Sequence, residues 1–420
     1  MSRQSVPRCF LVAAAGLGMA FTAWTSPVVL TFHTDFEGGN LGKVERVGKA
    51  HFRCTIDGES DQDGRNRQTS WFYFRIDGAA GQQVTLDFGT LPGEYNYQPN
   101  RGGFDDAVPP VISYDRKTWT HLSKAEYDEA TNLLTVHFRV KHSPVWIARI
   151  PPYTNRDLVR LMDETARSPF LKRSVIGRSV ESRPIWLLSV TDPAVPDKSK
   201  KVLWLMARQH SWESGTSWVN EGALRFLLSS DTRAQWIREH CVFNDFPLCD
   251  PDGVARGGVR FNRYGYDLNR NWDTADPKNM PEIAALRKTI LDWVDSGKPV
   301  DLFLAMHNDE RGEVIMAPPA SPGPDYTALG NRFLQILKEK TSFHATGPVV
   351  HTKLPPRRGR MSVYQGLYYD RDIPSFLSEQ MISANQTLGE YPSVQDRLKF
   401  GGELVRAMVE AVFPPSVVWK

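Results

Sequence analysis

The spacing of apolar residues changes at about Pro151, and this change limits the possible folds more than any other feature of the 420-residue chain. Before it, apolar residues take every second position in stretches such as residues 134–140; after it, continuous apolar runs alternate with segments of helical spacing. The first pattern predicts antiparallel strands, and the second predicts an α/β domain. We therefore expect two domains, residues 26–150 and residues 151–420, as the length also suggests.

The first region has the composition of a β-sandwich. Residues 71–76 and 84–88 are rich in aromatic and β-branched side chains, and Gly and Pro separate these short runs. Several short strands with turns between them predict an antiparallel sandwich.

The second region reads as alternating strands and helices. The expected strands are residues 202–206, 242–247, 301–306 and 373–378, and the expected helices are residues 217–230, 326–340 and 398–412 and a segment that starts at Pro281. In such domains functional side chains gather where strands end.

The N-terminus has the pattern of a targeting segment. Arg3 and Arg8 precede an apolar run at residues 9–21, and small residues follow at Ala23 and Thr25. We expect a cleaved signal peptide over residues 1–25, hence a secreted or periplasmic protein without stable membrane insertion. An uncleaved N-terminal membrane anchor is the alternative, although the run is short for a span of roughly 20 residues.

Charge and cysteine content exclude some functions. The net charge is +3, and Arg3 and Arg8 contribute two of these charges, which leaves +1 for the rest of the chain. This gives no reason to expect nucleic acid or an anionic membrane as a partner.

No CxxC spacing occurs, so we interpret Cys241 and Cys249 as buried small hydrophobic residues. The sequence leaves the oligomeric state open.

Three residues at the ends of two expected strands could bind one metal ion. His210 and Glu213 follow the strand at residues 202–206, and His307 follows the strand at residues 301–306. Imidazole nitrogens and a carboxylate suit zinc, and three protein ligands leave a fourth position for water, as in catalytic sites. Taken singly, each of these residues has a plainer interpretation, such as a hydrogen-bonded core histidine.

A loop between these residues carries two arginines. It runs from Asp250 through Arg260 to the segment at residues 267–272, which contains Asn269 and Arg270. The planar guanidinium group suits a carboxylate or a developing oxyanion, and the adjacent amide of Asn269 completes a possible carboxylate clamp. A solvated basic loop is the alternative.

These motifs together resemble the carboxypeptidase A-like zinc peptidases, most closely the cytosolic carboxypeptidase subfamily and its bacterial relatives. The family pattern pairs HxxE with a distant His, an NPDG-V loop, a DLNRNW segment and a late Glu. The corresponding positions here are His210 and Glu213, residues 251–254, residues 267–272, His307 and Glu379. Residues 71–75, 110–114 and 151–154 resemble recurring phrases of the subfamily's N-terminal domain. Asp250 stands where the family usually has Asn, which we expect to alter a turn only.

The resemblance implies a mixed-sheet, carboxypeptidase-like catalytic domain preceded by the sandwich. It implies one Zn²⁺ held by His210, Glu213 and His307. It also implies that Arg260 stabilises the tetrahedral oxyanion, that Glu379 is the general base, and that Asn269 and Arg270 hold the substrate's terminal carboxylate. The resemblance further implies a tyrosine that closes over the substrate; Tyr364, Tyr368 and Tyr369 lie in the corresponding stretch, and Tyr364 is the best match.

The predicted function is that of a zinc-dependent metallocarboxypeptidase that hydrolyses the C-terminal peptide or isopeptide bond of a peptide with a free terminal carboxylate. One alternative is a zinc deacylase or amidase that acts on acyl-amino acids or cell-wall peptides, and another is a non-catalytic peptide-binding protein. Arg357, Arg358 and Arg360 form either a cationic specificity pocket or a solvated loop. The expected signal conflicts with the word cytosolic in the subfamily's name and excludes intracellular targets such as tubulin.

Overall fold

The structure is a computed structural model that describes residues 29–95, 97–100, 104–320 and 323–419. The signal peptide expected at residues 1–25 lies outside these residues. Among the residues described, no helix has the length and apolar character needed to span a bilayer.

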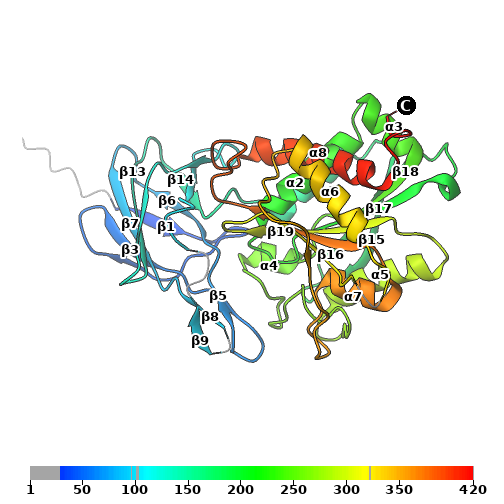
Figure 1. The fold of residues 1–420 in the computed structure, drawn as a ribbon. Helices are drawn as coiled ribbons and strands as arrows, with labels where there is room; N and C mark the ends of the chain where they lie inside the picture. The colour runs from blue at the N-terminus through cyan, green and yellow to red at the C-terminus, as the bar shows by residue number, and fades with distance from the viewer. Residues whose placement is uncertain (1–28, 96, 101–103, 321–322, 420) are drawn as a thin grey trace, which may run out of the picture.

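The N-terminal region forms the expected sandwich (Figure 1). One five-stranded sheet has the order β1 (Thr31–His33), β6 (Tyr73–Asp77), β14 (Val145–Ala148), β10 (Val111–Ser113) and β11 (Thr120–His121). The other has the order β12 (Ala125–Asp128), β13 (Leu133–Arg139), β7 (Gln83–Gly89), β3 (His51–Thr55) and β2 (Val44–Arg46). The pairs within these sheets are antiparallel except for the β3–β7 pair, which is parallel.

The alternation in the sequence explains the sandwich core. In β13 the side chains of Leu134, Val136 and Phe138 are buried, while the residues between them are partly or fully exposed. They pack with Phe72 and Phe88, whose rings stack at a centroid distance of 4.6 Å. The prediction of an antiparallel sandwich is confirmed.

A smaller sheet, which the sequence did not predict, extends from the sandwich beside the catalytic domain (Figure 1). It consists of β4 (Glu59–Ser60), β5 (Arg67–Gln68), β8 (Gly93–Tyr95) and β9 (Gln98–Asn100). Strands of two or three residues show no measurable alternation, so their sequence carries no strand signal.

The second region is built on an eight-stranded mixed sheet. Its order is β15 (Leu171–Arg178), β16 (Pro184–Val190), β18 (Cys241–Phe246), β17 (Lys201–Ala207), β19 (Leu302–Asp309), β22 (Ser375–Met381), β20 (Val314–Ala317) and β21 (Val350–His351). The central strands β18, β17, β19 and β22 are parallel to one another, and antiparallel pairs flank them. The predicted mixed sheet is confirmed.

Helices cover both faces of this sheet. Leu203 and Leu205 of β17 belong to a core shared with α2 (Ser214–Leu227), α6 (Thr327–Lys340) and α8 (Val394–Val412). Trp204 on the opposite face packs with α5 (Pro281–Asp295) and α7 (Val363–Arg371). Burial on both faces explains why these strands read as continuous apolar runs. The remaining helices are α1 (Asn155–Glu164), η1 (Asp197–Ser199), α3 (Thr232–His240) and α4 (Pro251–Arg256).

The segment that follows Asp250 differs from the sequence expectation of a loop, because it forms the short helix α4. Pro251 occupies the first helical position, where a missing N–H costs nothing. The Asp250 carboxylate accepts a hydrogen bond of 2.8 Å from Gly253 N, so Asp250 acts as an N-cap. Gly257 ends the helix with φ 70°.

Candidate functional site

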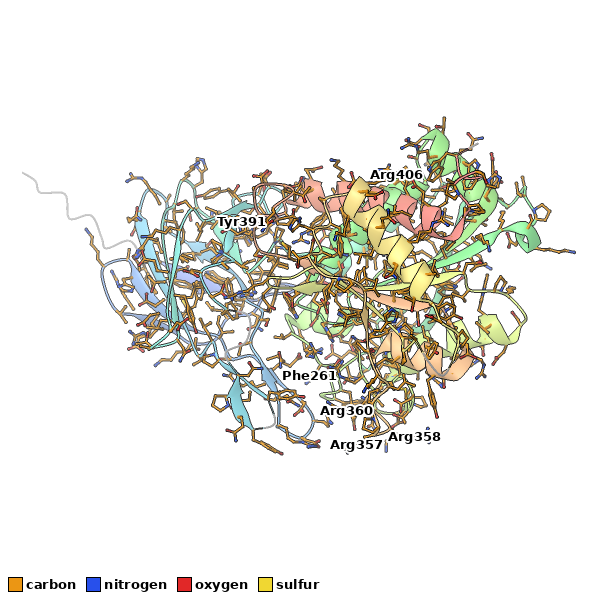
Figure 2. The ribbon with its side chains drawn as sticks, viewed as in Figure 1. Phe261, Arg357, Arg358, Arg360, Tyr391 and Arg406 are labelled. Carbon is orange, nitrogen blue, oxygen red and sulfur yellow. The ribbon has the colours of Figure 1, made fainter. Side chains whose placement is uncertain are left out.

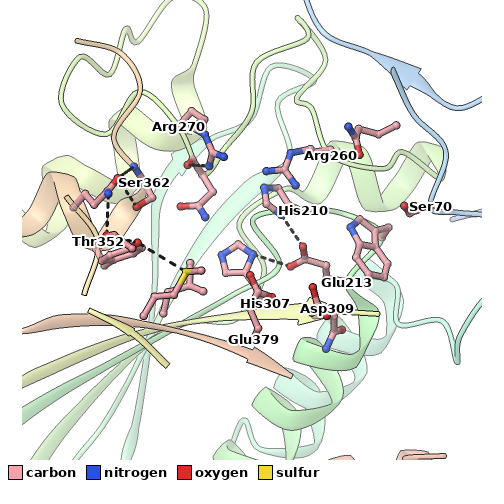
Figure 3. A pocket seen from close by; sticks show the side chains of 18 of the residues that line it. Ser70, His210, Glu213, Arg260, Arg270, His307, Asp309, Thr352, Ser362 and Glu379 are labelled. Atoms are coloured by element: carbon pink, nitrogen blue, oxygen red, sulfur yellow. Dashed lines mark hydrogen bonds and ion pairs between the residues drawn. The ribbon is translucent and has the colours of Figure 1, made fainter. Parts of the chain in front are cut away.

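The parallel strands bring the candidate residues to one edge of the sheet. His210 follows β17, and His307 lies in β19, the next strand. In the β19–β22 register His307 is directly paired with Glu379. His210, His307 and Glu379 therefore meet at the ends of adjacent strands (Figure 3), although the first and the last are 169 positions apart in the sequence.

His210, Glu213 and His307 form a buried cluster with the spacing of a metal site. Nδ1 of His210 lies 2.6 Å from Oε1 of Glu213, and Nδ1 of His307 lies 2.9 Å from Oε2 of the same carboxylate. One ligand atom from each residue lies within 4.8 Å of the others. All three residues are at most 2% exposed. The set of two imidazoles and one carboxylate fits zinc.

The outer nitrogens of the two imidazoles are occupied by protein acceptors. His210 Nε2 donates to Oδ1 of Asp267 at 3.1 Å, and His307 Nε2 donates to Oε1 of Gln209 at 3.0 Å. Each ring therefore carries its proton on Nε2 and turns the Nδ1 lone pair toward Glu213. This is the arrangement that metal-binding histidines require.

Sequence reasoning gave Asp267 and Gln209 no role. Asp267 lies within the 267–272 segment, and Gln209 directly precedes a ligand candidate, so both were close to signals that the sequence does contain. The hydrogen bond of Asp267 depends on how the chain folds back after α4, which the sequence does not show.

Glu379 extends into the same space without a fixed partner. Its Oε2 atom is buried and has no hydrogen-bond partner in the structure. Burial, followed by the charge of Glu213, raises the pKa of Glu379 well above its usual value. A carboxylate that is poorly solvated and unpaired is a stronger proton acceptor than one on the surface.

Arg260 lies above the cluster and is held by Asp267. Its Nε donates to Oδ2 of Asp267 at 2.8 Å. Burial alone would lower the pKa of Arg260, but the carboxylates of Asp267 and then Glu213 outweigh burial and raise it. The guanidinium group therefore stays charged beside the metal-site candidates (Figure 3).

Asn269, Arg270 and Tyr364 line the same cavity as the metal-site candidates. Arg270 Nη1 donates to the Asn269 carbonyl oxygen at 2.8 Å, and Asn269 Oδ1 accepts from Val363 N at 2.9 Å. Tyr364 is 3% exposed, and its hydroxyl lies 2.8 Å from Oγ1 of Thr352. In this position the hydroxyl is hydrogen-bonded to Thr352 and does not close over a substrate, so the role of Tyr364 as a closing tyrosine stays a prediction.

All eight candidate residues line one cavity of about 640 Å³. The N-terminal domain contributes Gln68, Ser70 and Asn100 to its wall. Arg360 lines this cavity and also a neighbouring cavity of about 330 Å³, which it shares with Arg357 and Arg358. Figure 2 shows Arg357 and Arg358 at the outer edge of the molecule.

Comparison with protein families gives two matches. Residues 158–346 match a family model described as zinc carboxypeptidase, and residues 32–150 match one described as cytosolic carboxypeptidase N-terminal domain. Among curated proteins, cytosolic carboxypeptidase 6 of Caenorhabditis elegans is 28% identical over 331 residues, covering 75% of this chain and 67% of that protein. Cytosolic carboxypeptidase 2 of Macaca fascicularis is 29% identical over 306 residues, covering 67% of this chain but 35% of that protein.

Solved structures share the fold over nearly the whole chain. A metallo-carboxypeptidase from Burkholderia cenocepacia aligns with a TM-score of 0.78 and 22% identity, covering 91% of this chain and 99% of that one. A metallo-carboxypeptidase from Pseudomonas aeruginosa, solved in complex with (2-guanidinoethylmercapto)succinic acid, aligns with a TM-score of 0.76 and 23% identity, covering 91% and 100%. At such identities the likeness establishes the fold.

The expectation of a secreted or periplasmic protein is contradicted by these comparisons. The curated relatives cited above are named cytosolic carboxypeptidases, and a secretory destination has no support among them. The predictions of the family and its single zinc ion are confirmed. The chain therefore carries a zinc carboxypeptidase domain, which follows a cytosolic carboxypeptidase N-terminal domain.

Proposed function

We propose that this chain hydrolyses the C-terminal peptide or isopeptide bond of a peptide substrate that has a free terminal carboxylate. The observation that carries the proposal is the cluster of His210, Glu213 and His307 beside Glu379 in one cavity. The chain spans between about a third and about two thirds of the length of the two curated relatives cited above, so its activity is proposed for the chain itself.

Each residue of the proposed metal site has its own role. His210 and His307 would bind one zinc ion through Nδ1, and Glu213 would bind it through its carboxylate. Bound zinc supplies a Lewis acid and lowers the pKa of a coordinated water to about 7. Asp267 and Gln209 keep the two imidazoles in the required orientation.

The other residues act on the substrate and its protons. Glu379 accepts a proton from the attacking water at Oε2 and passes it to the leaving amine. Arg260 donates hydrogen bonds to the oxygen that gains negative charge. Asn269 and Arg270 bind the terminal carboxylate, and Tyr364 closes the far wall of the cavity.

The division of the chain is part of the same proposal. We assign residues 26–150 to the N-terminal domain and residues 151–420 to the catalytic domain. The change of topology after β14 and the family matches on either side support this division.

A zinc deacylase acting on acyl-amino acids is the competing function. A deacylase would need the same metal and the same base. Its substrate, however, would be an amino acid that carries an acyl group, and not the last residue of a peptide. The experiment is to incubate the purified, zinc-loaded chain with peptides that differ at the C-terminus and with acyl-amino acids, using mass detection. Loss of single C-terminal residues from free-acid peptides, but not from their amidated forms, is the expected result. Equal cleavage of both forms would contradict the proposal in favour of the deacylase.

A further inference from the structure

We propose that Glu59 of the N-terminal domain is a positioning residue for Arg260, so that the N-terminal domain completes the active site. The inference rests on the proposed role of Arg260 in stabilising the oxyanion. It assigns a catalytic contribution to a residue that touches neither the metal site nor the cavity and lies 201 positions away from Arg260.

One oxygen of Glu59 receives three successive backbone amides of the catalytic domain. Oε2 accepts from Val259 N at 3.0 Å, from Arg260 N at 2.7 Å and from Phe261 N at 2.8 Å. Oε1 accepts from Arg256 Nη2 at 2.5 Å. Consecutive amides that converge on one point form an anion-binding nest. Here the anion is a side chain from the other domain.

Three further hydrogen bonds from the N-terminal domain hold the same loop. Gly38 N donates to Ala255 O at 3.0 Å, Asn40 Nδ2 donates to Gly257 O at 2.6 Å, and Gln62 N donates to Gly265 O at 3.2 Å. The segment over residues 255–265, which comprises the end of α4 and the loop after it, is therefore bound to the N-terminal domain at its beginning, its middle and its end.

The packing at Gly257 shows how close the two domains approach. A Cβ atom at this position would lie 2.6 Å from the Gly39 carbonyl oxygen, and φ is +70°. Side chains other than glycine are excluded here on both grounds. The backbones of the two domains therefore approach closely at Gly257.

The position of this loop determines the position of the Arg260 side chain. The guanidinium group bonds to Asp267, and Asp267 bonds to His210. Both ends of Arg260 are thus fixed, its backbone by Glu59 and its side chain by Asp267. Without Glu59, three part-buried amides lose their acceptor, and the loop must move to bring them to water.

Glu37 provides a matched control at the same domain junction. It is also a carboxylate of the N-terminal domain, and its Oε1 accepts from Asn155 N at 3.0 Å and from Asn155 Nδ2 at 2.8 Å. Asn155 begins α1, and within the described part of the chain the hydrogen bonds and the ion pair of Glu37 reach Asn155 and Arg156 and not the Arg260 loop. A residue that only joins the two domains would behave like Glu37.

The kinetic test compares Glu59→Ala, Glu59→Gln and Glu37→Ala in the full-length, zinc-loaded chain. We expect Glu59→Ala to lower kcat by about 10- to 100-fold with KM nearly unchanged, because a misplaced oxyanion donor costs turnover and not substrate binding. Glu59→Gln keeps an acceptor oxygen and should recover part of this loss. Glu37→Ala should keep wild-type kcat. In an Arg260→Ala background, Glu59→Ala should have no further effect on kcat.

Hydrogen exchange of residues 255–265, followed by mass spectrometry, tests the same contact independently of activity. Both Glu59 variants should exchange faster in this segment than the wild type, whereas Glu37→Ala should not. Unchanged exchange would overturn the proposal, as would a Glu59→Ala variant with the kcat of Glu37→Ala. If the wild type cleaves no peptide, the proposed function fails, and the exchange result still decides whether Glu59 holds the loop.

Discussion

Oδ1 of Asp267 lies 3.1 Å from Nε2 of His210, although 57 positions separate the two residues. The Asp267→Asn variant loses the negative charge that favours an Nε2–H tautomer. We expect its zinc affinity to fall by about 10- to 100-fold, as for other partners of metal-binding histidines. Competition with a chromogenic chelator measures this affinity. Asp292→Asn, at an exposed position of α5, is the control. Equal zinc affinities in the two variants would show that Asp267 does not support the metal site.

Replacing His307 with alanine should abolish stoichiometric zinc binding. The change leaves two ligands, which do not hold a catalytic zinc ion. Metal analysis of the purified variant measures the effect, with His142→Ala, an exposed histidine of the N-terminal domain, as the control. Full occupancy in His307→Ala would show that the ligand set is wrong.

Glu379→Gln should retain zinc and fold but lose most of its turnover. The amide cannot accept the proton of the attacking water, and the loss of a positioned base costs about 10²- to 10⁴-fold in rate. Steady-state kinetics beside metal analysis separates this effect from loss of the ion. Turnover near that of the wild type would place the base elsewhere.

Arg270→Ala should impair the cleavage of free-acid peptides far more than that of amidated ones. A carboxylate that loses a buried charge-assisted partner costs about 2–5 kcal/mol, which is at least some 30-fold in kcat/KM. Amidated peptides have no such charge to lose. Parallel kcat/KM measurements on one peptide in both forms decide the matter, and equal losses would contradict the carboxylate clamp.

The buried Asp245 should make the wild type lose stability as the pH rises. Burial raises the pKa of Asp245 to about 8, although Asn220 donates a hydrogen bond of 2.6 Å to its Oδ1. Between about pH 4 and pH 8 the unfolded chain has released this proton and the folded chain has not. The free energy of unfolding should therefore fall by up to about 1.4 kcal/mol per pH unit relative to Asp245→Asn. Denaturant unfolding of both proteins at pH 5 and pH 8.5 gives the comparison, and a constant difference would refute it.

The sequence was sufficient where a candidate residue lies at the end of a long regular element. His210 follows β17 and His307 lies near the end of β19, and both strands are buried on both faces and read as unbroken apolar runs. Adjacent parallel strands end at the same edge of a sheet, so the meeting of these two residues could be predicted. The family resemblance supplied Glu379, whose neighbours alone would not distinguish it from an ordinary charge at a strand end.

The sequence was insufficient where the contacts join short irregular segments. Glu59 lies in a two-residue strand, which is too short to show a periodic pattern. Its partners at residues 259–261 follow the helix α4, a segment that we expected to be a loop because of its Pro and Gly residues. Contacts of this kind depend on how two domains dock, and no local pattern encodes docking.

The nest around Glu59 also bears on how this chain can be recombined with others. A chimera that joins a foreign β-sandwich to residues 151–420 would inherit every residue proposed for chemistry. It would reach the turnover of the native chain only if the donor supplied a carboxylate opposite residues 259–261 and a bare backbone opposite Gly257. In gene fusion or domain shuffling, the two domains should therefore be transferred together. An insertion is tolerated best outside the interface between them.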